Sequence, residues 1–375
     1  MRTTVSKKDI EHAVSITSRA ISQKSPLPIL SHFLVKAETG KLTVSATDLE
    51  IGIECTVKAQ VMEEGAFTTP ARTFQEIVSL LPEEDLLLTI EREELTITSS
   101  RSNFTLMTLS ADEFPLIPKI SEISDFTTTQ KTLKELIRHV NFAAAEQEET
   151  RAILTGVLIV LKDNIVEFIA TDGRRLARMK ETVERVSEND MRFVIPSRTL
   201  DELVKFLKDP EDRVSVCVKG GQVLFEMSGL YVLSRILDGK YPGFEQIVSL
   251  VPDKKVKIDR HQLLIAVKRA LVMARDKQNP QLIRMKVEKD RVILKSNTPD
   301  IGSAFEEVPS SLEGGEVEIA FNGDYFCEVL TTLVENTVIL ELTESDMPSI
   351  VKPAGRENYV YVVMPVRLKE HIVED

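Results

Sequence analysis

The chain repeats itself with a period of about 126 residues. Three segments of similar pattern share an acidic residue at the same place: TTPARTFQEIVSLL, FVIPSRTLDELVKFL and, more faintly, IAFNGDYFCEVLTTL, at 68–81, 193–207 and 319–333. Their glutamates Glu76, Glu202 and Glu328 are spaced 202 − 76 = 126 and 328 − 202 = 126. Self-similarity at a fixed period decides the architecture before any local pattern does.

Two further sets of landmarks repeat with nearly the same period. Asp48, Asp172 and Asp300, in ATDLEIGIE, ATDGRRLAR and SNTPDIGSA, lie 124 and 128 residues apart. A strand-like segment begins at each of three further positions, 126 and 129 residues apart: Asn103, Gly229 and Asn358. Independent landmarks with one period predict three homologous domains, at 1–122, 123–249 and 250–375.

Each repeat opens with an amphipathic helical pattern, and the three helices are expected at 6–21, 128–140 and 259–274. N-capping residues stand in place at the first helix, where either Ser6 or Asp9 can serve, and at the third, where Asp259 can. Strands follow each first helix; the segment 51–61, for example, alternates apolar and polar residues. The second helix of each repeat is the 126-period segment, and more strands come after it. The order predicts an α+β fold in which two helices per domain pack on antiparallel sheets.

The segment YVVMPVRL, at 361–368, begins as a strand and then changes character. Tyr361 to Val363 belong to an alternating run of strand formers. Pro365 lacks a ladder donor, so the strand must end there or lie at an edge. Apolar residues nonetheless continue beyond it, although a chain end ordinarily becomes polar and frays.

The composition restricts the class of protein. The formal net charge is −12, from 47 Lys and Arg against 59 Asp and Glu, which argues against a protein that coats nucleic acid with its whole surface. The three cysteines lack metal-binding spacing and suit a reducing compartment. With no apolar leader pattern and no long apolar run, we expect a cytoplasmic protein.

No catalytic constellation is recognisable in the sequence. There is no phosphate-binding glycine loop, no pair of histidines on one helix turn and no serine elbow. The repeated Asp48, Asp172 and Asp300 are acidic, but equivalent positions in three separate repeats cannot converge on one metal ion. Their repetition favours a turn or capping role. We therefore expect a protein that is not an enzyme and needs no cofactor or metal.

The first helices carry cations that the acidic net charge conceals. Lys131, Lys134 and Arg138 share one side of the second of these helices, while Leu133, Leu136, Ile137 and Val140 share the other. A similar stripe is formed by His261, Lys268 and Arg275, and the first helix offers Lys7, Lys8 and Arg19. Charged surface helices are common, but three equivalent ones are harder to dismiss. Without any base-reading motif, they predict contacts to the DNA backbone that carry no sequence information.

Four features together resemble the beta subunits of bacterial DNA polymerase III, the family of sliding clamps. They are the three repeats, SPLPILSHFLV near the start, ATDGRRLA in the second repeat, and YVVMPVRL near the end. The resemblance covers residues 1 to about 368. It implies a head-to-tail homodimer that closes a ring around duplex DNA, with helices inside and sheets outside. It also implies that the polymerase III alpha subunit, the clamp loader and other replication proteins tether themselves by a short peptide.

The resemblance further implies a peptide pocket built from the ATDGRRL segment, the YPGFEQIV segment and the C-terminal segment. The residues carried over are Leu154, Thr171, Gly173, Arg174, Arg175, Leu176, Pro242, Ile247, Met347, Pro348, Val362, Val363, Met364, Pro365, Val366, Arg367 and Leu368. Only the second repeat has Gly-Arg-Arg after its aspartate, which indicates one such site per chain.

For DNA, the resemblance adds Lys24, Gln147 and Arg151 to the cations of the first helices. Here the sequence departs from the family, since Glu146, Glu148 and Glu149 make the second of these loops acidic. For ring closure it implies two kinds of contact. Phe104 and Leu106 would meet Leu271 and Val272, while Arg72 and Arg101 would pair with Glu306 and Glu307.

Two other classes of function stay open at the level of sequence. A metal-dependent nuclease could use the repeated aspartates, in which case the purified protein would hydrolyse DNA with Mg²⁺. A three-repeat scaffold could instead bind peptides without binding DNA. Charge reversal on the helix at 128–140 distinguishes this scaffold from the clamp.

Overall fold

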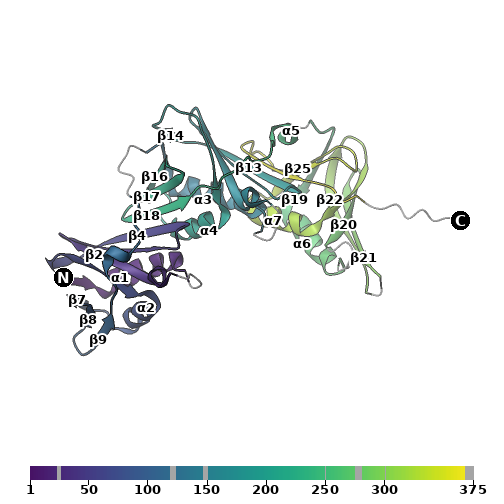
Figure 1. Cartoon of the computed structure of the whole chain (residues 1–375). Coiled ribbons are helices and arrows are strands. Elements are labelled where there is room, and N and C mark those ends of the chain that lie inside the picture. The colour runs from purple at the N-terminus through teal and green to yellow at the C-terminus, as the bar shows by residue number, and fades with distance from the viewer. Residues whose placement is uncertain are drawn as a thin grey trace. The chain divides into compact units, whose positions relative to one another are not determined.

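The computed structural model describes residues 1–22, 27–118, 124–146, 151–249, 251–274, 281–299 and 301–367 (Figure 1). The chain separates into two compact units, which do not follow the three repeats. The first comprises Met1–Leu133, Val183–Asn189 and Arg198–Ile236, and the second comprises Lys134–Thr182, Asp190–Ser197 and Leu237–Asp375. The repeats are divided because strands pair across their boundaries. The domain limits given above therefore stay a prediction.

The first unit holds two antiparallel sheets. One has the strand order β5-β1-β7-β8-β9 and the other β14-β10-β16-β17-β18-β4-β3-β2-β6. Their bounds are β1 Arg2–Ser6, β2 His32–Glu38, β3 Lys41–Thr47, β4 Ile51–Lys58, β5 Gln60–Glu63, β6 Gly65–Pro70, β7 Asp85–Glu91, β8 Glu94–Thr98, β9 Asn103–Met107, β10 Phe126–Thr129, β14 Glu184–Arg185, β16 Arg213–Lys219, β17 Gln222–Met227 and β18 Leu230–Arg235. The pairing of β4 with β18 joins the first repeat to the second.

The second unit holds a single sheet of strand order β15-β11-β12-β13-β26-β25-β24-β19-β22-β21-β20-β23. Their bounds are β11 Gly156–Lys162, β12 Ile165–Thr171, β13 Arg175–Thr182, β15 Met191–Pro196, β19 Lys254–Asp259, β20 Leu282–Val287, β21 Arg291–Thr298, β22 Gly302–Glu313, β23 Val317–Asn322, β24 Thr337–Leu342, β25 Ser349–Pro353 and β26 Tyr359–Val363. Here β13 pairs with β26 and joins the second repeat to the third.

Each repeat opens with a strand, β1, β10 or β19, and not with a helix as predicted. After that strand the predicted order of helix, strands, helix and strands follows in all three repeats. The helices are α1 Lys7–Thr17, α2 Ala71–Leu80, α3 Gln130–Val140, α4 Ser197–Phe206, α5 Glu245–Val248, α6 Arg260–Leu271 and α7 Gly323–Thr332. Short 3-10 turns are η1 Ser18–Ala20, η2 Pro28–Ser31, η3 Ala111–Glu113, η4 Asn141–Ala143 and η5 Ala152–Thr155.

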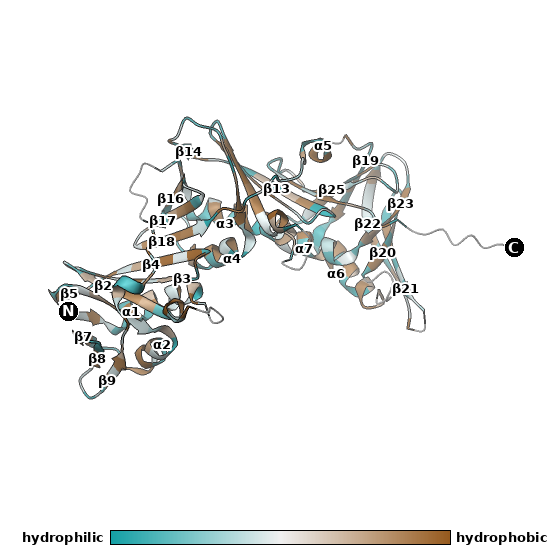
Figure 2. Ribbon diagram, viewed as in Figure 1, coloured by the Kyte–Doolittle hydropathy of each residue, from teal (hydrophilic) through white to brown (hydrophobic). Residues whose placement is uncertain are grey.

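The predicted cap at Asp259 is confirmed, and of the two candidates at the first helix Ser6 is the cap and Asp9 is not. The Ser6 hydroxyl accepts a hydrogen bond from the Asp9 amide at 3.1 Å, and the Asp259 carboxylate accepts one from the Gln262 amide at 2.8 Å. These side chains satisfy amides that have no partner inside the helix. The first helices are amphipathic, and Figure 2 shows both hydrophilic and hydrophobic residues on α6. On α3, the predicted apolar side, Leu133, Leu136, Ile137 and Val140, is buried.

Asp48 and Asp172 have the turn role that their repetition predicted. The Asp48 carboxylate accepts hydrogen bonds from the amides of Glu50 and Ile51, at 3.0 and 2.9 Å. Asp172 accepts from the amides of Arg174 and Arg175, at 2.8 and 3.0 Å. Each aspartate thus closes the turn between two strands of its repeat. Asp300 lies outside the described residues.

Candidate functional site

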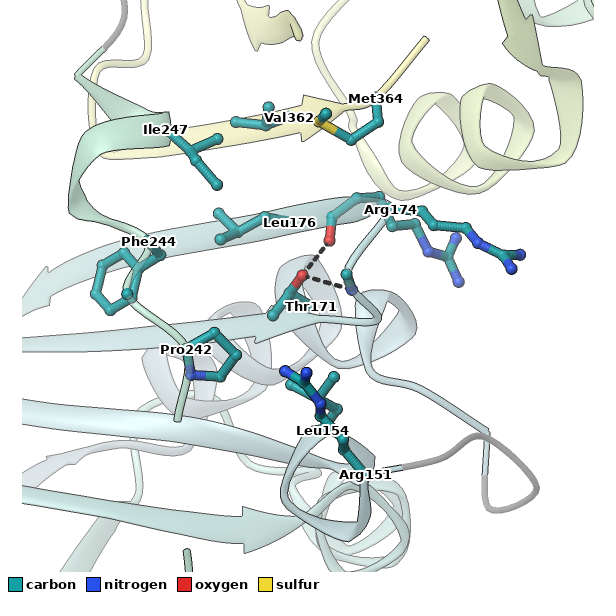
Figure 3. Close-up of a pocket in the computed structure, with 13 residues that line it drawn as sticks. Arg151, Leu154, Thr171, Arg174, Leu176, Pro242, Phe244, Ile247, Val362 and Met364 are labelled. Carbon is teal, nitrogen blue, oxygen red and sulfur yellow. Dashed lines mark hydrogen bonds between the residues drawn. The ribbon is translucent and has the colours of Figure 1, made fainter. Parts of the chain in front are cut away.

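A cavity of about 200 Å³ opens in the second unit. Its walls come from η5 and the segment before it, the turn between β12 and β13, the segment that leads into α5, and β26 (Figure 3). The lining residues are Arg151, Leu154, Thr171, Gly173, Arg174, Arg175, Leu176, Pro242, Gly243, Phe244, Ile247, Val362 and Met364. A small apolar cavity of this kind suits one or two side chains of a ligand.

The turn at one side of the cavity is held by a threonine. The Thr171 hydroxyl donates to the Arg175 carbonyl at 2.5 Å and accepts from the Gly173 amide at 3.0 Å. Gly173 has a φ of +89°, a conformation that glycine adopts without steric cost. No atom lies within 4 Å of the position that a Cβ would take there, so this side of the turn faces open space.

The inner walls are apolar. Leu154, Leu176, Phe244 and Val362 are buried and belong to one hydrophobic cluster. Met364 follows the end of β26 and has 40% of its surface exposed. Met364 therefore offers an adaptable apolar side chain at the mouth of a preformed apolar cavity.

Arginines lie in the cavity lining and behind it, near Phe244. Arg151 and Arg174 line the cavity and are exposed. The guanidinium of Arg192 lies 5.8 Å from the centre of the Phe244 ring and that of Arg178 lies 6.0 Å from it, which favours cation–π attraction. Arg178 pairs with Glu167 and Arg192 with Glu245, so among these arginines it is Arg151 and Arg174 that bring positive charge to the cavity lining.

Arg175 lines the cavity, but its guanidinium binds other groups of the protein. Its Nε donates to Asp172 Oδ2 at 2.9 Å and its Nη2 to the Phe142 carbonyl at 2.8 Å. Its Nη1 pairs with Glu328 of α7, and the guanidinium lies 4.4 Å from the centre of the Tyr325 ring. Because these groups come from the second and third repeats, Arg175 fastens the two together.

Several residues predicted for the pocket do not line it: Met347, Pro348, Val363, Pro365, Val366 and Arg367. Val363 points away from the pocket because alternate residues of a strand face opposite ways and Val362 takes the pocket side, and it is fully buried on the other face. The Val366 amide donates to the Ala320 carbonyl at 2.8 Å, so the segment after Met364 turns toward β23. Met347 lies in the turn between β24 and β25. Leu368 lies outside the described residues.

Two lining residues were missed by the sequence analysis, Gly243 and Phe244. Both stand between Pro242 and Ile247, which were identified, so the segment itself contained the signal. A third lining residue, Arg151, was assigned to DNA instead.

One residue of the predicted DNA-facing set needs correction. Lys7 is only 7% exposed and pairs with Glu11 and Glu83, at 2.8 and 3.0 Å. These hydrogen bonds, first that to Glu11 and then that to Glu83, raise the pKa of Lys7. Its charge is therefore neutralised within the first unit. Glu83 is 76 residues away in the chain, so the helical pattern could not indicate this pairing.

Most of the other predicted DNA-facing residues lie at the surface. Lys8, Lys131, Arg138, His261 and Lys268 are exposed, and Lys134 is half-buried. Arg19 pairs with Glu202 at 3.2 Å. Lys24, Gln147 and Arg275 lie outside the described residues.

The predicted dimer residues lie on exposed elements. Phe104 and Leu106 belong to β9, which lies at the edge of its sheet. Val272 is exposed and Leu271 half-buried at the end of α6. Within the chain, however, the predicted ion-pair residues have other partners. Glu306 pairs with Arg269 (2.5 Å), Glu307 with Arg291 (3.3 Å) and Arg72 with Glu76 (3.2 Å), while Arg101 is exposed.

Two further features concern the described residues alone. Among them, no three His, Cys, Asp or Glu side chains are grouped so that they could hold a metal ion. No helix in this part of the chain has the length and apolar composition needed to cross a membrane.

Comparisons with known proteins cover almost the whole chain. Residues 1–118, 127–243 and 249–367 match the models for the N-terminal, central and C-terminal domains of the DNA polymerase III beta subunit. The beta sliding clamp of Synechococcus elongatus is 31% identical over 98% of this chain and 100% of its own. That of Staphylococcus aureus is 34% identical over 94% of this chain and 95% of its own.

Solved structures give the same result. The DNA polymerase sliding clamp of Bacillus subtilis superimposes with a TM-score of 0.94 at 28% identity, over 98% of this chain and 100% of that one. The beta subunit of Thermotoga maritima superimposes with a TM-score of 0.88 at 30% identity, again over 98% of this chain and 100% of that one.

Proposed function

The chain belongs to the DNA polymerase III beta subunit family, the beta sliding clamps, and we propose that it encircles duplex DNA as a head-to-tail homodimer and tethers replication proteins through its pocket. The family consists of non-catalytic processivity factors. We further propose that the protein works in the cytoplasm. The observation that carries the tethering proposal is the preformed apolar cavity at the β13–β26 junction.

The cavity supports weak, exchangeable binding of a short peptide. Burial of one Leu or Phe side chain contributes about 1.5–3 kcal/mol. Two such anchors with backbone hydrogen bonds, less the cost of ordering the peptide, suggest about 8 kcal/mol, or micromolar affinity. Affinity of this order lets partners replace one another at a single site. We propose the polymerase III alpha subunit and the clamp loader as the first of these partners.

Two methionines provide a matched test of this site. Met364 lines the cavity and Met347 does not, yet both are 40% exposed. Overlapping peptides that span the alpha subunit would be screened by fluorescence polarisation, and the tightest one kept as the probe. Met364→Glu should weaken its binding at least tenfold, because a carboxylate would replace an apolar contact, whereas Met347→Glu should leave the affinity unchanged. Equal loss in both variants, or no binding peptide at all, would contradict the proposed pocket.

Two strand edges that have no partner among the described residues support the ring. In the described part of the chain, β9 pairs only with β8. Likewise residues 302–309 of β22 pair only on the side of β21, since β19 takes up residues 310–313. Exposed edges of this kind invite another strand. The repeats pair β4 with β18 and β13 with β26. We propose that β22 pairs in the same way with β9 of a second copy.

The two internal ladders also suggest the register of this seam. Cys55 opposes Leu230, and Met179 opposes Tyr359. Cys55 and Met179 each lie seven residues after the repeated aspartate (55 − 48 = 7 and 179 − 172 = 7). The residue seven positions after Asp300 is Glu307. On the partner strands, Leu230 and Tyr359 each stand one residue after a repeated landmark, Gly229 or Asn358, and the equivalent residue of β9 is Phe104, one residue after Asn103.

In this register Glu307 opposes Phe104 of the partner subunit, and Phe305 opposes Leu106 of the partner subunit. Phe305 was not predicted for the seam, but it is 58% exposed. A head-to-tail seam between identical subunits forms a closed ring when the rotations from one subunit to the next add up to a full turn.

A further inference from the structure

The two walls of the pocket come from segments far apart in the chain. Thr171 and Leu176 belong to the end of β12 and to β13, whereas Val362 and Met364 belong to β26 and the residue after it. They face each other because β13 and β26 pair from Arg175 opposite Val363 to Met179 opposite Tyr359. The pocket lies at the first end of this ladder. Any separation of the two strands would therefore part its walls.

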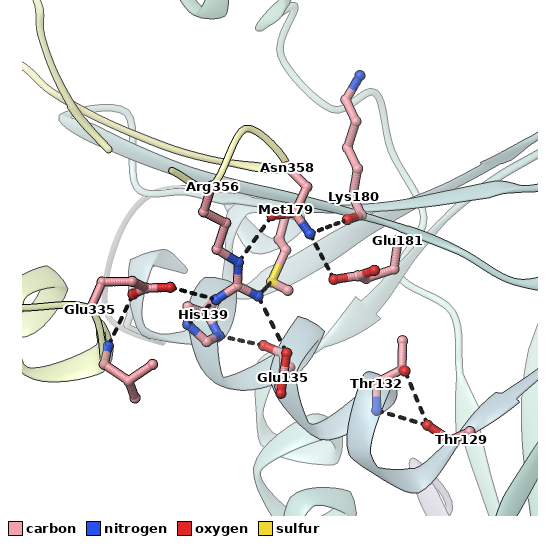
Figure 4. A network of polar contacts seen from close by, with 11 residues as sticks. Thr129, Thr132, Glu135, His139, Met179, Lys180, Glu181, Glu335, Arg356 and Asn358 are labelled. Carbon is pink, nitrogen blue, oxygen red and sulfur yellow. Dashed lines mark hydrogen bonds and ion pairs between the residues drawn. The ribbon is translucent and has the colours of Figure 1, made fainter. Parts of the chain in front are cut away.

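An arginine stands at the other end of the ladder (Figure 4). Arg356, in the turn between β25 and β26, donates through Nε to Asn358 Oδ1 at 3.0 Å. Its Nη2 lies 3.3 Å from Glu135 Oε2 on α3, and its Nη1 lies 3.4 Å from Glu335 Oε1. Asn358 in turn donates to the Lys180 carbonyl at 3.1 Å and to the Glu181 carboxylate at 2.7 Å. One side chain thus connects the second repeat with the third.

His139 takes part in this network in its neutral form. It is 5% exposed, and its Nδ1 lies 2.8 Å from the Glu135 carbonyl, which can only accept. Nδ1 therefore carries the proton, and the lone pair of Nε2 faces Arg356 Nη1 at 3.4 Å. A second proton, on Nε2, would place a positively charged imidazole beside the positively charged guanidinium of Arg356. The Tyr359 ring, 5.4 Å away between centroids, packs across the imidazole.

The charges around His139 act in both directions. Burial lowers the pKa of His139, and Arg356 from the β25–β26 turn lowers it further. Glu335, from the segment after α7, and Glu135, on the same helix, raise it in part. Glu181 on β13 faces Arg356 and Glu135, and burial raises its pKa. With the pKa of His139 below its usual 6.5, the folded form takes up this proton less readily than the unfolded chain.

We propose that Arg356 is a positioning residue of the peptide pocket. Through Glu135, Glu335 and neutral His139 it holds β26 against β13, so that the pocket walls at the opposite end of the ladder stay together. The inference rests on the proposed peptide binding. The two sites lie at opposite ends of one strand pair, and a change in peptide affinity on substitution of Arg356 is the evidence that they are coupled.

The test uses the full chain and the alpha-subunit peptide selected above. Arg356→Met should weaken peptide binding at pH 7.5 roughly 2- to 30-fold. Arg356→Lys, which keeps the cation but not the fork of donors, should lie between it and the unsubstituted protein. Lys352→Met is the control, because Lys352 on β25 pairs with Glu341 inside the third repeat and does not bridge to β13. Circular dichroism and thermal melting establish that each variant is folded.

A pH series separates this role from a general loss of stability. Binding to the unsubstituted protein should be constant above pH 7 and weaken as the pH falls below 6.5, where His139 begins to take up a proton. His139→Gln, whose amide oxygen can still accept from Arg356, should lack this acid limb. Glu181→Gln should keep it. The series remains decisive if Arg356→Met does not fold.

The outcomes distinguish the two proposals. If the unsubstituted protein binds the peptide but Arg356→Met binds it equally well, the positioning role is wrong and the pocket stands. The same conclusion follows if His139→Gln keeps the full acid limb. If no alpha-subunit peptide binds at pH 7.5, the proposed function fails, and this inference fails with it.

Discussion

At the scale of single residues, the same turn is built twice with different backbone strain. Asp48 and Asp172 cap equivalent turns, and the next residue in each has a positive φ: +76° for Leu49 and +89° for Gly173. Leucine pays a steric penalty in this region that glycine does not. The second repeat, which carries the pocket, has the unstrained form.

Substitution of Gly173 tests this difference. Gly173→Ala should lower the free energy of unfolding by about 1 kcal/mol through its φ alone, because the added Cβ would meet no atom within 4 Å. Gly243→Ala is the control, since Gly243 lines the same cavity without a positive φ. Denaturant titration measures both, and an equal effect of the two substitutions would show that the turn is not the cause.

At the scale of elements, local patterns predicted more than pairing did. The helix caps at Ser6 and Asp259 depend on residues three positions away, so the sequence contains the whole signal. The cross-repeat ladders β4–β18 and β13–β26 depend on partners far along the chain, which periodicity cannot identify. For the same reason Lys7 was misassigned, because its partner Glu83 comes from the segment before β7.

In the pocket, too, the sequence predicted some lining residues correctly and could not predict how the chain arranges the others. Motif resemblance identified the turn at Gly173 and the end of β26, and both line the cavity. It also took in Val363 and Val366, because a motif does not distinguish the two faces of a strand or show where the chain turns away. The use of Arg175 within the protein could be recognised only once Glu328 was placed beside it.

Helix α3 is the element on which the DNA contact can be tested. Reversal of Lys131, Lys134 and Arg138 to Glu should weaken binding to duplex DNA at least tenfold and lower the slope of log affinity against log salt by about 0.9 for each lost phosphate contact. Reversal of the exposed Lys255 and Lys257 on β19 to Glu is the control. Unchanged DNA affinity in the α3 variant, with peptide binding intact, would favour a scaffold that binds peptides only.

At the scale of the whole molecule, one pairing principle recurs. A strand from the second half of one repeat adds to the sheet of the repeat before it, at β4–β18 and at β13–β26. The first repeat offers β9 and the third offers the outer edge of β22, and neither has a partner there within the described residues. A second copy of the chain would pair with both edges by the same principle and so form the proposed head-to-tail ring.

Disulfide trapping of this seam tests the ring most directly. Directly opposed residues of antiparallel strands have Cα atoms about 4.5–5.5 Å apart, which a disulfide can span. We expect the protein that carries both Leu106→Cys and Phe305→Cys to oxidise to a covalent dimer at micromolar concentration, which a non-reducing gel detects. Leu106→Cys with Glu306→Cys, one residue out of register and on the opposite face, should stay uncrosslinked. A monomer in the first variant, or equal crosslinking in both, would contradict the head-to-tail ring.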